Sequence, residues 1–225
     1  MKCFAWSWLL PLTLVAIGLT NPSYANHIDF IDDAGFFMFA DSVTGSSSST
    51  QTGAAGNILQ TEREVDLTFS SGSGFISTGI VAPPGPGPVV GPPSNPAIEL
   101  LFDNSVNSLG TLTLTYDGVG GAGFAPPVDF DTLWNFITVD MSAVQGSGNL
   151  TVAVTDSSNN TGSLTGAVAT AGTYSFPFSN PAYSGVNFSA VSRVVVSLAT
   201  TTAASDFAIN EITRSQRHDM EVVCA

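Results

Sequence analysis

Positive charge is scarce in this 225-residue sequence, which has five Lys and Arg residues against 18 Asp and Glu and a formal net charge of −13. Nucleic-acid binding depends on Lys and Arg that neutralise phosphates and release counterions, so this balance argues against a nucleic-acid partner. Charged residues of both signs make up only 10% of the chain, whereas 44% is hydrophobic. That composition excludes a charge-rich disordered chain and a coiled coil, and it predicts a folded core.

Cysteine and histidine are equally scarce. Cys224 is the only cysteine outside the first 25 residues, so we expect no intramolecular disulfide. A Ser-His-Asp triad needs a histidine beside the serine, but His27 and His218 lie near the two ends of the chain and no G-x-S-x-G motif occurs. The H-E-x-x-H and C-x-x-C spacings of zinc sites are also missing. The sequence therefore argues against triad hydrolases and zinc enzymes.

Residues 1–25 have the order of a secretory signal peptide: Lys2, then an apolar run over 4–20, then Ser-Tyr-Ala. An uncleaved membrane anchor is the alternative, but Pro11 interrupts a run that is already short for a span of about 20 residues. Cleavage would leave Asn26 first. Because no second apolar span follows, we expect a secreted or cell-surface protein with no membrane span after cleavage.

Short segments of alternating polarity predict an all-β protein without long helices. The clearest strands, in which every second side chain is apolar, are 65–69, 112–116, 150–154 and 194–198. Further strands are expected at 35–40, 75–81, 97–102, 136–141, 163–169, 173–178 and 207–212. About eleven strands with no helices between them predict an antiparallel β-sandwich of jelly-roll type.

One domain is expected over residues 26–213, followed by a C-terminal tail at 214–225. The segment 156–162 contains Asn and Gly residues and is predicted to form a hairpin turn. Residues 83–96 contain seven of the 13 prolines and are predicted to form an exposed loop insertion, because proline cannot donate to a strand ladder. The serine-rich segment 45–50 is predicted to be a flexible loop.

The C-terminal half contains the segments Leu150–Asp156, Tyr174–Ser179, Val186–Phe188, Val194–Val196 and Asp206–Ile212. Together they resemble secreted bacterial β-sandwich proteins of the kind found among exosortase-sorted (PEP-CTERM) proteins. The likeness covers about Asp103 to Ile212 and implies an exported β-sandwich of bacterial origin. The residues after Ile212 do not resemble the Pro-Glu-Pro sorting signal of those proteins, so we do not expect that mode of anchoring.

The last of these segments also resembles the final strand of jelly-roll carbohydrate-binding modules, which implies that Asp206 holds a structural calcium ion. The first and last strands of a jelly roll commonly pair, which would bring acids near the start of the domain close to Asp206 or Glu211. Calcium takes six to eight oxygen ligands, and a secreted chain without disulfides needs another means of stabilisation. The alternative is that these acids belong to turns and caps. The expected ligands are Asp206, Glu211, Asp29, Asp32 and Asp33.

Sugar binding would need exposed aromatic side chains, because the apolar face of a sugar ring stacks on them while polar groups bond its hydroxyls. The candidates are Trp134, Tyr116, Tyr174 and Tyr183. Core packing is the alternative for Trp134, since both faces of its predicted strand are apolar.

These observations predict a secreted, non-catalytic extracellular module whose partner is an extracellular polysaccharide. A structural envelope protein without a ligand is one alternative. A glycoside hydrolase is another, because two carboxylates suffice for that chemistry and the chain has 13 Asp, although no pair stands out.

Overall fold

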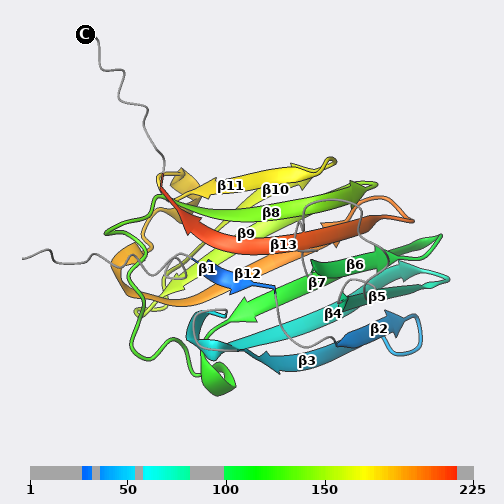
Figure 1. Ribbon diagram of the computed structural model, residues 1–225, viewed down its shortest axis with the longest axis horizontal. Coiled ribbons are helices and arrows are strands. Elements are labelled where there is room, and N and C mark those ends of the chain that lie inside the picture. The colour runs from blue at the N-terminus through cyan, green and yellow to red at the C-terminus, as the bar shows by residue number, and fades with distance from the viewer. Residues whose placement is uncertain (1–26, 32–35, 54–57, 82–98, 217–225) are drawn as a thin grey trace, which may run out of the picture.

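The computed structural model describes residues 27–31, 36–53, 58–81 and 99–216, which form two facing antiparallel sheets (Figure 1). The predicted signal peptide and the proline-rich segment 83–96 lie outside the described residues. Sheet A has the spatial order β11 (Gly172–Pro177), β8 (Phe136–Gln145), β13 (Asp206–Ser215), β6 (Glu99–Asn104), β5 (Phe75–Val81) and β2 (Phe37–Asp41), with β1 (His27–Phe30) also paired to β13. Sheet B has the order β10 (Thr161–Val168), β9 (Gly148–Asp156), β12 (Val191–Thr200), β7 (Ser108–Tyr116), β4 (Glu62–Gly72) and β3 (Ser46–Thr52).

Helical structure in the described residues is limited to four 3-10 turns, η1 (Leu59–Thr61), η2 (Val119–Gly121), η3 (Pro181–Tyr183) and η4 (Phe188–Ala190). The predicted all-β sandwich of jelly-roll type is therefore confirmed. Each strand that the polarity pattern predicted is present, with bounds shifted by a few residues. The predicted turn after Asp156 does connect β9 to β10, and Asn159 has a φ of 65° there.

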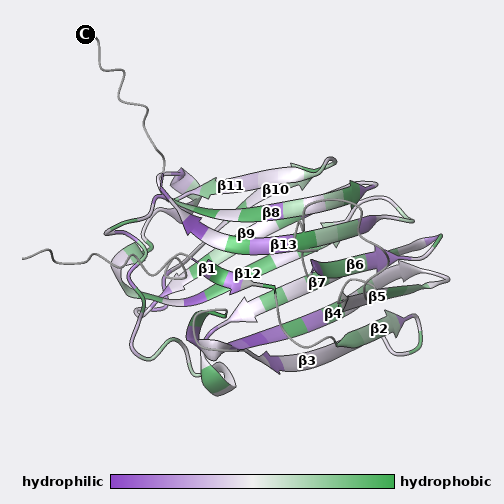
Figure 2. Cartoon of the chain, in the orientation of Figure 1, coloured by the Kyte–Doolittle hydropathy of each residue, from purple (hydrophilic) through white to green (hydrophobic). Residues whose placement is uncertain are grey.

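The core lies between the two sheets, because alternate side chains of each strand point inward. In β9, Leu150, Val152 and Val154 are fully buried, while the residues between them face outward. The same alternation appears as hydrophobic bands along the strands in Figure 2. Burial of this apolar surface is the main stabilising contribution to the sandwich.

The serine-rich segment predicted to be a loop is instead strand β3, and this prediction was wrong. β3 lies at the edge of sheet B and pairs with β4 over its whole length, with Ser46 opposite Thr68 and Thr52 opposite Glu62. Its side chains alternate between exposed and half-buried, so no apolar face marks it in the sequence. Backbone hydrogen bonds to a neighbouring strand decide its conformation, and composition does not reveal them.

Strand β13 also runs further than the domain boundary drawn from the sequence. Arg214 and Ser215, assigned above to the tail, pair with Ile137 and Phe136 of β8. The tail from residue 217 onward lies outside the described residues.

Candidate functional site

Of the acids predicted to bind calcium, the three that the structure describes, Asp29, Asp206 and Glu211, do not lie together. β1 does pair with β13, as expected for first and last strands. However, Asp29 points into the interior, Glu211 lies beside His27 with Oε2 3.4 Å from Nδ1, and Asp206 lies at the opposite end of β13. Asp32 and Asp33 are outside the described residues. Within the part of the chain that the structure describes, no three His, Cys, Asp or Glu side chains are close enough to hold a metal ion.

Asp29 has a different role from the predicted one. Its Oδ2 lies 2.5 Å from Nη1 of Arg63 on β4 and accepts a hydrogen bond of 2.6 Å from the hydroxyl of Tyr116 on β7. All three side chains are fully buried. A buried arginine already balances this carboxylate, so Asp29 is not an open cation ligand.

The predicted sugar-stacking residues do not form an exposed row. Tyr116 and Tyr183 are buried, and the Tyr183 hydroxyl donates to the carbonyl oxygen of Val152 at 2.9 Å. Burial raises the pKa of both tyrosines. Tyr174 is half-buried and donates to the carbonyl of Thr170.

Trp134 is half-buried and precedes β8, so it lies in no strand, contrary to the alternative considered above. The guanidinium of Arg214 lies 5.5 Å from the centre of its ring and 4.9 Å from that of Phe130. Such cation–π contacts hold the tryptophan against the sandwich.

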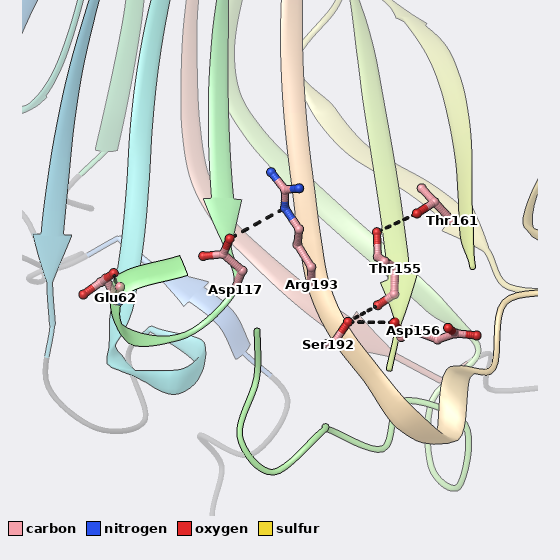
Figure 3. Close-up of polar contacts among 8 residues, drawn as sticks. Glu62, Asp117, Thr155, Asp156, Thr161, Ser192 and Arg193 are labelled. Carbon is pink, nitrogen blue, oxygen red and sulfur yellow. Dashed lines mark hydrogen bonds and ion pairs between the residues drawn. The ribbon is translucent and has the colours of Figure 1, made fainter. Parts of the chain in front are cut away.

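A pocket of about 410 Å³ lies at one end of sheet B, where β7 and β9 end and β12 begins. We call it the loop pocket. It is lined by Asp117, Gly121, Ala122, Gly123, Phe124, Pro127, Thr155, Ser157, Asn159, Ser192 and Arg193. Figure 3 shows how Asp117, Arg193 and Thr155 follow one another across the ends of the strands.

One wall of the loop pocket is formed by residues 121–124 of the glycine-rich segment 118–124, which follows β7. Gly118 has a φ of 77°, and a Cβ there would lie 2.8 Å from the carbonyl oxygen of Gly123, so only glycine fits without distortion. The side chain of Glu62 accepts a hydrogen bond from the amide of Gly120 at 2.8 Å, and the amide of Phe124 donates to the carbonyl of Ser192. These contacts attach the loop to β4 and β12.

The opposite wall is the turn between β9 and β10, which Asp156 organises. Its carboxylate accepts hydrogen bonds from the amides of Ser158, Asn160 and Asn187 and from the side-chain amide of Asn160. The side-chain bond from Asn160 and the amide of Asn187 are the main reasons that the pKa of Asp156 falls to about 2. The ionised carboxylate of Asp156 thus stabilises the turn through four hydrogen bonds.

Ser192 lines the loop pocket and lies at a β-bulge. The register between β12 and β9 shifts between Val191 and Arg193, which leaves Ser192 as the extra residue. Its hydroxyl lies 3.2 Å from the carbonyl oxygen of Thr155 and 2.8 Å from that of Asp156, so it bridges the irregularity.

The charged groups of the loop pocket are Asp117 and Arg193. The Nε of Arg193 lies 3.7 Å from Oδ2 of Asp117, and the two side chains are 49% and 16% exposed. Arg193 is the most accessible arginine in the described part of the chain, since Arg63 and Arg214 are buried. The pocket therefore presents one cationic donor group beside one anionic acceptor group, next to the hydroxyl of Thr155.

Sequence reasoning did not identify Asp117 or Arg193. The only local signal is the run of glycines after Asp117, Gly-Val-Gly-Gly-Ala-Gly, which marks an unusual backbone conformation. Nothing in the sequence links that run to Arg193, because the pairing of β7 with β12 brings them together.

No family model and no curated protein matches the chain. Among solved structures, 18 chains are similar to it. One is the family 11 carbohydrate-binding module of the cellulosomal cellulase Lic26A-Cel5E of Clostridium thermocellum, with 12% identity, a TM-score of 0.38, and 85% of this chain and 96% of that one covered.

Two others are an exo-β-agarase, with 11% identity, a TM-score of 0.40, and 66% of this chain covered, and PfGH50B, with 14% identity, a TM-score of 0.37, and 55% covered. This chain spans only 23% and 22% of their respective lengths. At these identities and scores the likenesses say nothing of function.

Among the described residues, no helix has the length and apolarity to cross a membrane.

Proposed function

We propose that this protein is an exported, non-catalytic module that binds neutral polysaccharide through the loop pocket. The observation that carries the proposal is the lining of that pocket, which combines hydrogen-bond donors and acceptors around a space of about 410 Å³. Pockets for small ligands have volumes of roughly 300 to 1,000 Å³. The space therefore suits a short stretch of sugar units.

Sugar hydroxyls donate and accept hydrogen bonds at the same time, and the lining offers both kinds of partner. Asp117 accepts, Arg193 donates, and the side-chain amide of Asn159 can do both. Hydroxyls of Thr155 and Ser157 complete the set. Adjacent hydroxyls of one sugar ring can bond the carboxylate of Asp117 and the guanidinium of Arg193 together, since each group presents parallel bonding positions.

Charge supports a neutral ligand over an anionic one. Asp117 offsets the charge of Arg193 inside the pocket, and the whole chain carries a formal charge of −13. The net negative charge of the chain would therefore repel an approaching polyanion.

The acids near the pocket support binding over hydrolysis. Glycoside hydrolysis uses two carboxyl groups about 5 to 10 Å apart, one of which must hold a proton near neutral pH. Asp117 is the one carboxylate in the lining and lies against Arg193. Asp156 is nearby, but its carboxylate is occupied by four hydrogen bonds and its pKa is lowered to about 2, which does not suit a general acid.

The test is calorimetric titration with soluble oligosaccharides from neutral β-glucans, xylan and agarose. Asp117→Asn and Arg193→Gln are each expected to weaken binding at least tenfold, because each removes a charge-assisted hydrogen bond. Asp66→Asn is the matched control, since Asp66 lies on β4 away from the pocket lining. Unchanged binding in both pocket variants would contradict the proposal. Release of reducing ends that stops in Asp117→Asn would replace it with a hydrolase.

A further inference from the structure

Three phenylalanine side chains are exposed together on sheet A. Phe37 and Phe39 on β2 are 71% and 53% exposed, and Phe75 at the start of β5 is 51% exposed. β2 is the edge strand of the sheet, and its hydrophobic colouring is visible in Figure 2. We call these three residues the phenyl platform.

Strand register places the three rings on one face. Phe37 and Phe39 are two residues apart, so their side chains lie on the same side of β2, while Met38 and Ala40 between and beside them are buried in the core. Phe75 is opposite Asp41, which is two residues beyond Phe39 on the same side. The platform therefore belongs to the outer face of the sandwich.

The surroundings of the platform are polar and acidic. Ser77 is opposite Phe39, Asp103 is opposite Ser77, and Asp206 is opposite Asp103, so a row of polar residues leads away from the rings across β5, β6 and β13. At the end of β2, the carboxylate of Asp41 accepts hydrogen bonds from the amides of Val43 and Thr44, and these bonds lower its pKa. Asp41 is thus the acidic neighbour of the rings, whereas Asp103 lies two strands away from β2, beyond the buried Ser77.

The exposed area is too small for a stable dimer. An aromatic side chain has an area of roughly 200 Å², so the three rings together expose about 350 Å². A stable interface buries about 800 Å² on each partner. Two copies that each carry a charge of −13 would also repel each other. A membrane surface with anionic lipids is disfavoured for the same electrostatic reason.

We propose that the phenyl platform is a second polysaccharide-binding surface, separate from the loop pocket, for an extended neutral chain. The apolar faces of successive sugar rings would stack on the phenylalanines, and sugar hydroxyls at the edge would bond Asp41. A narrow ligand with apolar faces and hydroxyl edges matches a small aromatic patch with an acid at its edge. This inference rests on the proposed function for its ligand class but concerns a different sheet and different residues.

The test is retention of the purified protein on insoluble cellulose, chitin and β-1,3-glucan. The double variant Phe37→Ser/Phe39→Ser is expected to lose at least tenfold in retention on the polymer that holds the wild type. Leu133→Ser is the matched control, since Leu133 is 57% exposed but lies outside the platform. Melting curves of both variants establish that they fold.

Three outcomes of the retention experiment would overturn the platform proposal. The wild type is not retained, the double variant is retained as well as the wild type, or Leu133→Ser loses as much retention as the double variant. Concentration-dependent dimerisation that the double variant abolishes would assign the platform to a second copy, and binding to vesicles of anionic or zwitterionic lipid would assign it to a membrane. Soluble oligosaccharide binding sensitive to Asp117→Asn reports on the loop pocket alone, so the two proposals can fail separately.

Discussion

The carboxylate of Asp29 on β1 and the guanidinium of Arg63 on β4 form a fully buried ion pair, with Oδ2 2.5 Å from Nη1. β1 pairs with sheet A, whereas β4 belongs to sheet B, so the contact ties the two sheets together. Tyr116 donates to the same carboxylate from β7. A buried pair of this kind is costly to break, because removing one partner leaves the other charge in the interior.

Asp29→Asn is therefore expected to lower the free energy of unfolding by about 3 to 5 kcal/mol. Tyr116→Phe removes only one hydrogen bond to the carboxylate and should cost about 1.5 to 3 kcal/mol. Urea denaturation of the two variants and the wild type measures both effects. A loss in Asp29→Asn that is no larger than in Tyr116→Phe would show that the ion pair is not the main contribution.

The lowered pKa of Asp156 predicts that the folded protein loses stability at low pH. Its pKa in the folded protein is about 2, below its ordinary value of 3.8, because hydrogen bonds from Asn160 and the amide of Asn187 favour the ionised form. The unfolded state then takes up a proton first as pH falls, so this stabilisation is complete above about pH 5 and is lost towards pH 2.

Melting temperatures of the wild type and Asp156→Asn between pH 7 and pH 2 test this. The difference between the two proteins is expected to be constant above about pH 5 and to shrink below it, since asparagine does not titrate. A difference that stays the same down to pH 2 would contradict the assignment.

Asp103 and Asp206 are directly opposite each other on neighbouring strands, which predicts repulsion. Partial burial and the charge of Asp206 raise the pKa of Asp103. Because the folded pKa is raised, the folded state is favoured when Asp103 is protonated and loses stability as pH rises through that pKa. Asp103→Asn is therefore expected to stabilise the protein at pH 7 by on the order of 0.5 kcal/mol.

The sequence predicted that Asp206 holds calcium together with acids near the start of the domain, and the structure adds Asp103, opposite Asp206, as a further candidate ligand. A cation held by Asp206 and Asp103 would raise the melting temperature of the wild type, because it binds the folded state, and Asp103→Asn should weaken that response. Differential scanning fluorimetry with calcium and with a chelator measures it. If neither addition moves the melting temperature, calcium has no structural site here.

Gly118 and Gly120 test the role of the glycine loop in the loop pocket. Both have positive φ, but a Cβ at Gly118 would meet the carbonyl oxygen of Gly123 at 2.8 Å, whereas one at Gly120 would meet nothing within 4 Å. Gly118→Ala is expected to weaken oligosaccharide binding several-fold more than Gly120→Ala, in which only backbone strain of about 1 kcal/mol applies. Equal effects in calorimetry would show that the loop conformation is not needed for binding.

The sequence by itself determined the fold class. Alternation of apolar and polar side chains along segments such as 150–154 and 194–198 reflects a property of each strand alone, and the turn after Asp156 follows from local chemistry. Such patterns are visible in the sequence because neighbours along the chain produce them. The same reasoning did not find β3, whose strand conformation depends on its pairing with β4.

Tertiary structure alone decided the sites. The sequence predicted Asp29 to be a calcium ligand, but in the folded chain its buried carboxylate is the partner of Arg63 on β4. Asp117 and Arg193 meet only because β7 and β12 are adjacent, and Phe37 is exposed because its side chain lies on the outer face of the edge strand β2. Strand order and register set these contacts, and both depend on long-range pairing that no single segment of the sequence specifies.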